Sequence, residues 1–263
     1  MGHSRVGEKE RAVKYIASCS FGKDSFAMVL MLIEKEYPLD EIVYCHVKAT
    51  RELSGEYPEM VSYIETAKQY LEKLIKEKGL AVKIVTIENE LSFNEYFYRI
   101  REKGKRQGQI YGFPYTLGAW CNDRLKIRPI DKYFKAQGKH IRYIGLAADE
   151  PERLARLADN ERAPLAEWGL TETEARKYLK SRGLLCPLYL KFTRLGCWFC
   201  PKQSNASLEI LFREYPELWE RLKAWQDDSV VPFQPRMTVH DIERKFIIES
   251  RKKECRNTLF YYR

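Results

Sequence analysis

The chain has 263 residues, 44% of them hydrophobic and 32% charged, with a formal net charge of +9 and a pI near 9.1. This length is enough for one α/β domain with a smaller appendage, and no run of eighteen apolar residues indicates a membrane span. The polar start over residues 1–14 lacks a signal-peptide pattern, so we expect a soluble, cytoplasmic protein without membrane contact. The positive charge favours a polyanionic partner, and seven cysteines in a reducing compartment favour metal ligands, catalysts or buried hydrophobes over disulfides.

Strands and helices alternate in the first half of the sequence. Apolar, β-branched runs predict strands, and apolar residues at spacings of three and four predict the helices between them. The predicted strands are 15–19, 41–50, 81–87 and 141–146. The first predicted helix follows residues 20–25, a second ends at Gly79, and a third spans 120–134. This alternation predicts a parallel, doubly wound α/β sheet, with ligands beyond the carboxyl ends of its strands.

Residues 20–25, with the sequence Ser-Phe-Gly-Lys-Asp-Ser, connect the first predicted strand to the first predicted helix. Free backbone N–H groups and the helix dipole favour an anion at such a junction. Gly22 permits close approach of a phosphate, and Lys23 adds a mobile positive charge. The other polar side chains of the loop can bond phosphate oxygens or Mg²⁺: Ser20, Asp24 and Ser25. An ordinary capped turn is the alternative interpretation.

The hexapeptide resembles the Ser-Gly-Gly-Lys-Asp-Ser signature of the PP-loop ATP pyrophosphatases, a superfamily that also contains the PAPS reductases. The resemblance implies that the loop holds the pyrophosphate end of ATP while an oxygen attacks the α-phosphate, with Lys23 and Asp24 as catalytic residues. Phe21 replaces one of the two glycines, which reduces the backbone freedom at that position. The resemblance also places Glu150 near the nucleotide, whereas Ala147 occupies a position where these families usually have arginine.

Residues 94–118 combine positive charge with aromatic side chains. The basic residues are Arg99, Arg101, Lys103, Lys105 and Arg106, and the aromatic residues are Tyr96, Phe97, Tyr98, Tyr111, Phe113 and Tyr115. Cations neutralise phosphates and rings stack on bases, so the segment predicts a nucleic-acid surface. A solvated helix with an aromatic core face explains the pattern equally well. In the next helix, Arg124 and Lys126 are of the type that binds phosphate, and we expect them at the nucleotide.

Four cysteines form a candidate metal site. Cys197 and Cys200 are a Cys-x-x-Cys pair, and Cys121 and Cys186 can supply the remaining ligands. Aromatic neighbours favour an iron–sulfur cluster, with zinc and separate structural cysteines as alternatives. The set resembles the cysteines of the iron–sulfur ATP pyrophosphatase of DNA phosphorothioation systems and of its phage-borne, PAPS reductase-like relatives, which implies a 4Fe-4S cluster.

The last third of the chain is predicted to be helical. Residues 164–183 contain a capping box from Thr171 to Glu174, a helix over 204–225 is broken by Pro216, and a last helix spans 239–250. We expect a nucleotide-binding core over 12–160 and a helical region over 161–263 that carries the Cys-x-x-Cys ligands.

Three functions compete. The first is ATP-dependent adenylation of a substrate oxygen followed by sulfur transfer, with a cysteine desulfurase as sulfur donor and nucleic acid as acceptor. The second is PAPS or APS reduction to sulfite, with Cys255 as nucleophile. Lys23 and Asp24 favour the first function, because a reductase expels no pyrophosphate. The third is a non-catalytic, nucleic-acid-binding accessory protein. The sequence leaves a homo-oligomeric state open.

Overall fold

The computed structural model describes the backbone of residues 13–261 and the side chains of residues 13–252. The polar start over residues 1–12 and the side chain of Cys255 lie outside the described residues. Within the described range, no helix is long and apolar enough to cross a membrane. None of the six cysteines whose side chains are described forms a disulfide.

The chain forms two compact units that are both discontinuous in sequence. The first contains the chain up to Cys45 together with Ser62–Ile87 and Pro129–Cys186, and the second contains His46–Val61, Glu88–Arg128 and the chain from Pro187 onward. The units therefore interleave along the sequence, and the functional division expected at residues 160 and 161 stays a prediction.

Five parallel strands form one sheet in the order β3-β2-β1-β4-β5. The strands are β1 (Lys14–Ser18), β2 (Glu41–His46), β3 (Lys83–Glu88), β4 (His140–Ile144) and β5 (Glu161–Arg162). The predicted parallel sheet is confirmed. The two-residue β5 was not predicted, because Glu161 and Arg162 form no apolar run. Ser18 pairs with both Val43 and Ile144, so β1, β2 and β4 end at the same edge of the sheet.

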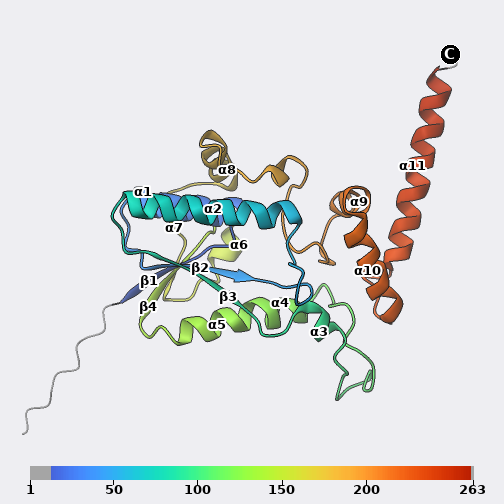
Figure 1. Ribbon diagram of the computed structural model, residues 1–263, viewed down its shortest axis with the longest axis horizontal. Coiled ribbons are helices and arrows are strands. Elements are labelled where there is room, and N and C mark those ends of the chain that lie inside the picture. The colour runs from blue at the N-terminus through green and yellow to red at the C-terminus, as the bar shows by residue number, and fades with distance from the viewer. Residues whose placement is uncertain (1–12, 262–263) are drawn as a thin grey trace, which may run out of the picture. The chain divides into compact units, whose positions relative to one another are not determined.

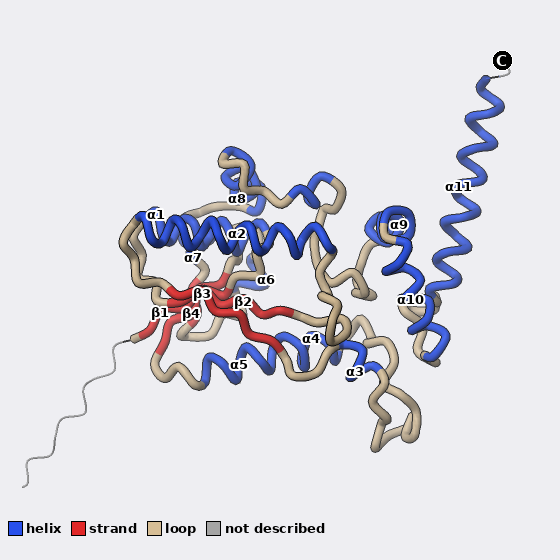
Figure 2. The backbone as a smooth tube through the Cα atoms, in the orientation of Figure 1, coloured by secondary structure: helices blue, strands red, loops and turns tan. Residues whose placement is uncertain are grey.

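Helices cover both faces of the sheet, as predicted for a doubly wound fold. Figures 1 and 2 show α1 (Lys23–Glu34) and α2 (Pro58–Glu77) on one face and α5 (Arg128–Lys135) on the other. On the first face, the rings of Phe26 and Tyr63 meet edge to face at 6.2 Å. On the second face, Phe134 of α5 packs with the buried strand residues Ile16 and Val43.

The helix predicted over 120–134 is interrupted, so that prediction was wrong in detail. The segment consists of α4 (Trp120–Asn122), a π-helical turn η1 (Asp123–Ile127) and α5. Pro129 has no N–H to donate to the Leu125 carbonyl, so a regular α-helical ladder cannot run through this point. The wider turn instead forms a bond from the Arg128 N–H to the Asp123 carbonyl.

Most C-terminal helices agree with the sequence patterns. They are α7 (Pro164–Glu167), α8 (Glu172–Ser181), α9 (Asn205–Glu214), α10 (Pro216–Asp228) and α11 (Val239–Tyr261). The short helices α3 (Phe93–Phe97) and α6 (Pro151–Leu154) precede them, and the 3-10 turn η2 (Pro187–Leu190) lies between α8 and α9. The capping box at Thr171 is confirmed, and Pro216 begins a new helix. The last helix continues to Tyr261 and does not end at Ser250 as predicted.

Phe21 adopts a backbone conformation that usually belongs to glycine. Its φ is 56°, in the left-handed region, which costs a residue with a Cβ about 1–2 kcal/mol. The side chain is fully buried and contacts Phe26 and Tyr44, with ring centroids 5.9 and 5.5 Å away. Burial of a phenylalanine side chain contributes about 1.5–3 kcal/mol, which offsets the strain.

We expect Phe21→Gly to destabilise the protein less than Phe21→Ala, by about 1 kcal/mol. Both variants lose the buried ring, but only glycine adopts φ near 56° without strain. Phe26 is the matched control, because it lies in regular helix, where glycine is less stable than alanine by about 1 kcal/mol. Denaturant unfolding of the four variants measures both differences. A glycine variant less stable than its alanine counterpart at position 21 would contradict the left-handed conformation.

Candidate functional site

The loop at residues 20–25 is closed by hydrogen bonds to one hydroxyl. Ser25 Oγ accepts from the Ser20 N–H at 3.1 Å and lies 3.2 Å from both Ser20 Oγ and the Gly22 carbonyl. Gly22 precedes the first helical residue and has no side chain with which to cap α1. The start of α1, which no described side chain caps, lies at the carboxyl edge of the sheet, where the helix dipole favours an anion. The anion site expected there stays a prediction.

Lys23 is held by two carboxylates. Its Nζ lies 2.8 Å from Asp24 Oδ2 and 2.6 Å from Glu172 Oε2. Burial lowers the pKa of Lys23, but the two carboxylates outweigh burial and raise it overall, so the ammonium stays charged. Burial raises the pKa of Asp24, and Lys23 offsets this only in part. Glu172 was not predicted as a site residue, because it lies in α8, far from the loop in sequence.

Gly145 lies directly against the loop. A Cβ at this position would lie 2.6 Å from the Cα and 2.7 Å from the backbone nitrogen of Ser25, closer than real Cβ contacts allow. The chain then continues to Glu150, whose carboxylate accepts from the Ala147 N–H at 3.1 Å and pairs with Arg153. Glu150 also contributes to the raised pKa of Asp24. The structure thus brings Glu150 close to the loop, whereas Arg153 is engaged in an ion pair.

We expect Gly145→Ala to weaken binding of the ATP expected at this loop by about fivefold or more, because the loop backbone must move to make room for the methyl group. Overpacking of this kind costs about 1–3 kcal/mol. Gly196→Ala is the matched control, since a Cβ there meets no atom within 4 Å. Titration with a fluorescent ATP analogue gives both affinities. Equal ATP affinity of the two variants would show that the loop does not depend on this contact.

Arg124 and Lys126, both expected at the nucleotide, belong to the second unit, where they lie at two different places. Arg124 lines a basic pocket together with Arg99 and Arg101. Lys126 lines a cavity that also contains cysteines. Both residues are part of η1, in which a π-helical turn changes the direction of successive side chains. Their role in nucleotide binding stays a prediction.

Three of the four predicted metal ligands line one cavity in the second unit. The cavity has a volume of about 540 Å³, and its walls include Cys121, Cys197, Cys200, Lys126, Tyr57 and Phe199. The Cys200 N–H donates to the Cys197 carbonyl at 3.0 Å, which closes the Cys-x-x-Cys turn. The cavity is therefore lined by soft sulfur donors with an aromatic surround, a donor set that suits an iron–sulfur cluster.

Aromatic packing positions these cysteines. Phe93 of α3 stacks on Trp120, the neighbour of Cys121, with centroids 5.1 Å apart, and contacts Phe199 at 4.2 Å. Trp198, fully buried, stacks on Trp225 at 5.3 Å, and its indole N–H donates to a backbone carbonyl. The residues beside the cysteines are thus fixed in the core, while the thiols face the cavity.

Burial favours the protonated thiol at two of these cysteines, Cys121 and Cys197. Desolvation raises the pKa of Cys197 to about 12 and that of Cys121 to about 11, with a contribution from the neighbouring Cys200 in both cases. Lys126 opposes both shifts. A bound metal centre deprotonates its thiol ligands, so these cysteines are more suited to ligation than to nucleophilic attack on their own.

Cys186 belongs to the first unit, where it is buried immediately before η2. Its role as fourth ligand stays a prediction. Among residues 13–252, no three histidine, cysteine or carboxylate side chains are close enough together to hold a single metal ion.

The basic and aromatic segment is divided between core and surface. Phe97 and Phe113 are fully buried, so the core-face interpretation is correct for them. Tyr98 donates to Asp228 at 2.6 Å. Tyr96 and Tyr111 carry arginine guanidinium groups on their rings. Most of the rings expected to stack on bases therefore already contact other side chains of the protein.

Comparison with known proteins relates the chain to one family. The phosphoadenosine phosphosulfate reductase domain matches residues 14–203, which include the loop at Ser20, Glu150 and all four candidate cysteine ligands. An uncharacterised nin region protein of Escherichia phage lambda is 40% identical over 70 residues, covering 22% of this chain and 24% of the relative. An uncharacterised protein of Methanocaldococcus jannaschii is 23% identical over 178 residues, covering 61% of this chain and 34% of the relative. The chain thus spans about a quarter and about a third of these two relatives' length.

Two solved structures are similar in part. PAPS reductase from Candida auris, in a phosphate complex, has a TM-score of 0.41 and 12% identity, covering 72% of this chain and 83% of that one. The U34-tRNA thiolase of Methanococcus maripaludis, solved with its [4Fe-4S] cluster, has a TM-score of 0.39 and 17% identity. The match covers 89% of this chain and 70% of the thiolase chain.

Proposed function

Because the chain belongs to the phosphoadenosine phosphosulfate reductase domain family, we propose that it binds ATP at residues 20–25 and transfers the adenylyl group to a substrate oxygen. The observation that carries this proposal is the position of Lys23 beside the uncapped start of α1. A charged ammonium beside the positive end of a helix dipole forms a site for a departing pyrophosphate.

The reaction begins with attack of the substrate oxygen on the α-phosphorus. The bond from that phosphorus to the bridging oxygen breaks, and pyrophosphate leaves with the electron pair, stabilised by Lys23 and the start of α1. Asp24 would hold a Mg²⁺ ion, which neutralises phosphate charge. The adenylylated oxygen is a good leaving group, and a sulfur nucleophile at the oxidation level of sulfide displaces AMP. A cysteine desulfurase with a reductant is the proposed sulfur source, and nucleic acid the proposed acceptor, as in DNA phosphorothioation.

Cys121, Cys197 and Cys200 would hold a 4Fe-4S cluster, with Cys186 as the proposed fourth ligand. Such a cluster supplies iron that can bind sulfur or transfer electrons. The buried aromatic side chain of Phe199 supports this assignment, because it supplies an apolar wall to the cavity that the three cysteines line. Lys126 offsets part of the negative charge that four thiolates would bring.

We expect Lys23→Ala to lower ATP-dependent pyrophosphate release by about 100-fold or more, the usual effect of removing one group that stabilises the leaving charge. The assay contains the purified protein, ATP, Mg²⁺, a sulfur donor and a single-stranded oligonucleotide, without oxygen. Lys76→Ala, at an exposed position on α2, is the matched control and should leave the rate unchanged.

The same assay distinguishes the competing functions. A PAPS or APS reductase would release sulfite from the sulfonucleotide and no pyrophosphate from ATP. An accessory protein would release neither while still binding nucleic acid. Sulfite formation by the wild-type chain, or an equal rate for Lys23→Ala and Lys76→Ala, would refute the adenylation proposal.

We expect the protein purified without oxygen to contain about four irons and four acid-labile sulfides per chain. Cys197→Ala should lose both, because the thiolate lines the cavity beside two others. Cys45→Ala is the matched control, since Cys45 lies in β2 of the first unit and lines no part of that cavity. Metal analysis and the absorption spectrum give the result. Stoichiometric zinc, or iron unaffected by Cys197→Ala, would overturn the cluster assignment.

A further inference from the structure

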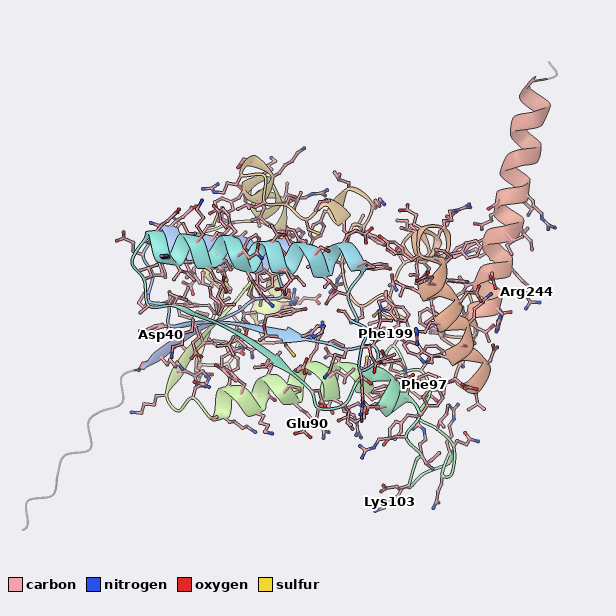
Figure 3. The ribbon with its side chains drawn as sticks, in the orientation of Figure 1. Asp40, Glu90, Phe97, Lys103, Phe199 and Arg244 are labelled. Carbon is pink, nitrogen blue, oxygen red and sulfur yellow. The ribbon has the colours of Figure 1, made fainter. Side chains whose placement is uncertain are left out.

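Residues 99–111 form an antiparallel hairpin in the second unit. Ile100 bridges to Ile110, and the Tyr111 N–H donates to the Arg99 carbonyl at 2.8 Å. Gly104 and Gly108 have φ values of 89° and 81°, which let the chain reverse tightly. Figure 3 shows Lys103 at the outer end of this hairpin. The hairpin therefore carries its cations on an ordered scaffold.

A basic pocket of about 380 Å³ lies at the base of the hairpin. Its lining residues are Arg99, Ile100, Arg101, Glu102, Lys103, Tyr111 and Arg124. Four of the seven are cations, and Glu102 is the one carboxylate among them. The hairpin continues with Lys105 and Arg106, so the positive charge extends beyond the pocket.

Tyrosine rings orient the arginines of this pocket. The Arg101 guanidinium lies 4.6 Å from the Tyr111 centroid and donates to the Tyr111 carbonyl at 2.8 Å. Arg124 lies 5.3 Å from the centroids of both Tyr96 and Tyr111. Arg99 lies 5.6 Å from Tyr96. Cation–π contacts of this kind fix the guanidinium planes while their charge stays uncompensated.

No carboxylate neutralises these groups. Within the described side chains, Arg99, Arg101 and Arg124 form no ion pair, although the protein contains many elsewhere. Charged guanidinium groups without a carboxylate partner form strong hydrogen bonds with anionic oxygens, so the arrangement favours an anionic ligand.

We propose that this pocket binds backbone phosphates of a nucleic-acid strand. Phosphate contacts are favoured over base stacking, because the faces of Tyr96 and Tyr111 are already occupied by guanidinium groups. A strand is favoured over a small phosphate compound, because the row of cations continues through Lys105 along the exposed hairpin. Binding of this kind is independent of base sequence and sensitive to salt. The inference names the acceptor of the proposed function and depends on that function only for the steps after binding.

The test measures binding of a fluorescein-labelled, single-stranded 12-nucleotide probe by anisotropy between about 50 and 200 mM KCl. We expect the double variant Arg99→Gln with Lys103→Gln to bind at least about tenfold more weakly at low salt. The slope of its plot of log affinity against log salt concentration should be smaller in magnitude by about 1.4, which is about 0.7 for each of the two lost phosphate contacts. The matched control, Lys73→Gln with Lys76→Gln, removes the same charge from exposed positions on α2 and should match the wild type.

Two results would overturn the proposal. One is equal probe affinity for the two double variants, with both shown to be folded by their melting curves. The other is displacement of the probe by inorganic phosphate at constant ionic strength, which would identify a small-anion site. Pyrophosphate release is measured separately. If probe binding depends on Arg99 and Lys103 but the wild-type protein does not turn over ATP, only the proposed function is refuted. If the wild-type protein turns over ATP but the double variant binds the probe as the wild type does, only this inference is refuted.

Discussion

The position of the loop at residues 20–25 depends on one strained and buried residue. Between the end of β1 at Ser18 and the start of α1 at Lys23, the chain must change direction over a few residues. Phe21 makes that reversal in a left-handed conformation and inserts its ring between Phe26 and Tyr44. The hydrophobic core thereby fixes the loop before any ligand arrives, which is the condition for preorganised electrostatic stabilisation.

Gly145 adds a second constraint from the neighbouring strand. Because β4 pairs with β1, its end passes so close to Ser25 that only a residue without a side chain fits. Both contacts constrain the same turn. One is a large side chain where the related loops have glycine, and the other is a glycine that allows backbone to meet backbone.

The sequence was sufficient to predict what depends on local pattern. Apolar runs located β1 to β4, the Ser20 loop followed from its residue types, and the Cys-x-x-Cys spacing indicated a shared site for Cys197 and Cys200. Contacts between distant segments were not predictable. Glu172 reaches Lys23 from another helix, and Phe93 links the segments of Cys121 and Cys200 through ring contacts that no spacing rule encodes. The apolar spacing over 120–134 predicted one regular helix. It gave no sign of the π-helical turn that Pro129 causes.

The ion pairs of Lys23 have a consequence for how ATP would enter the loop. With Asp24 and Glu172 already bonded to its ammonium, the lysine is not an unneutralised charge that waits for phosphate. An incoming triphosphate must take the place of a carboxylate as partner of the ammonium, but the displaced carboxylate stays in the site. Binding therefore adds negative charge that Lys23 alone does not balance, and the released carboxylate becomes available to the cation that accompanies ATP.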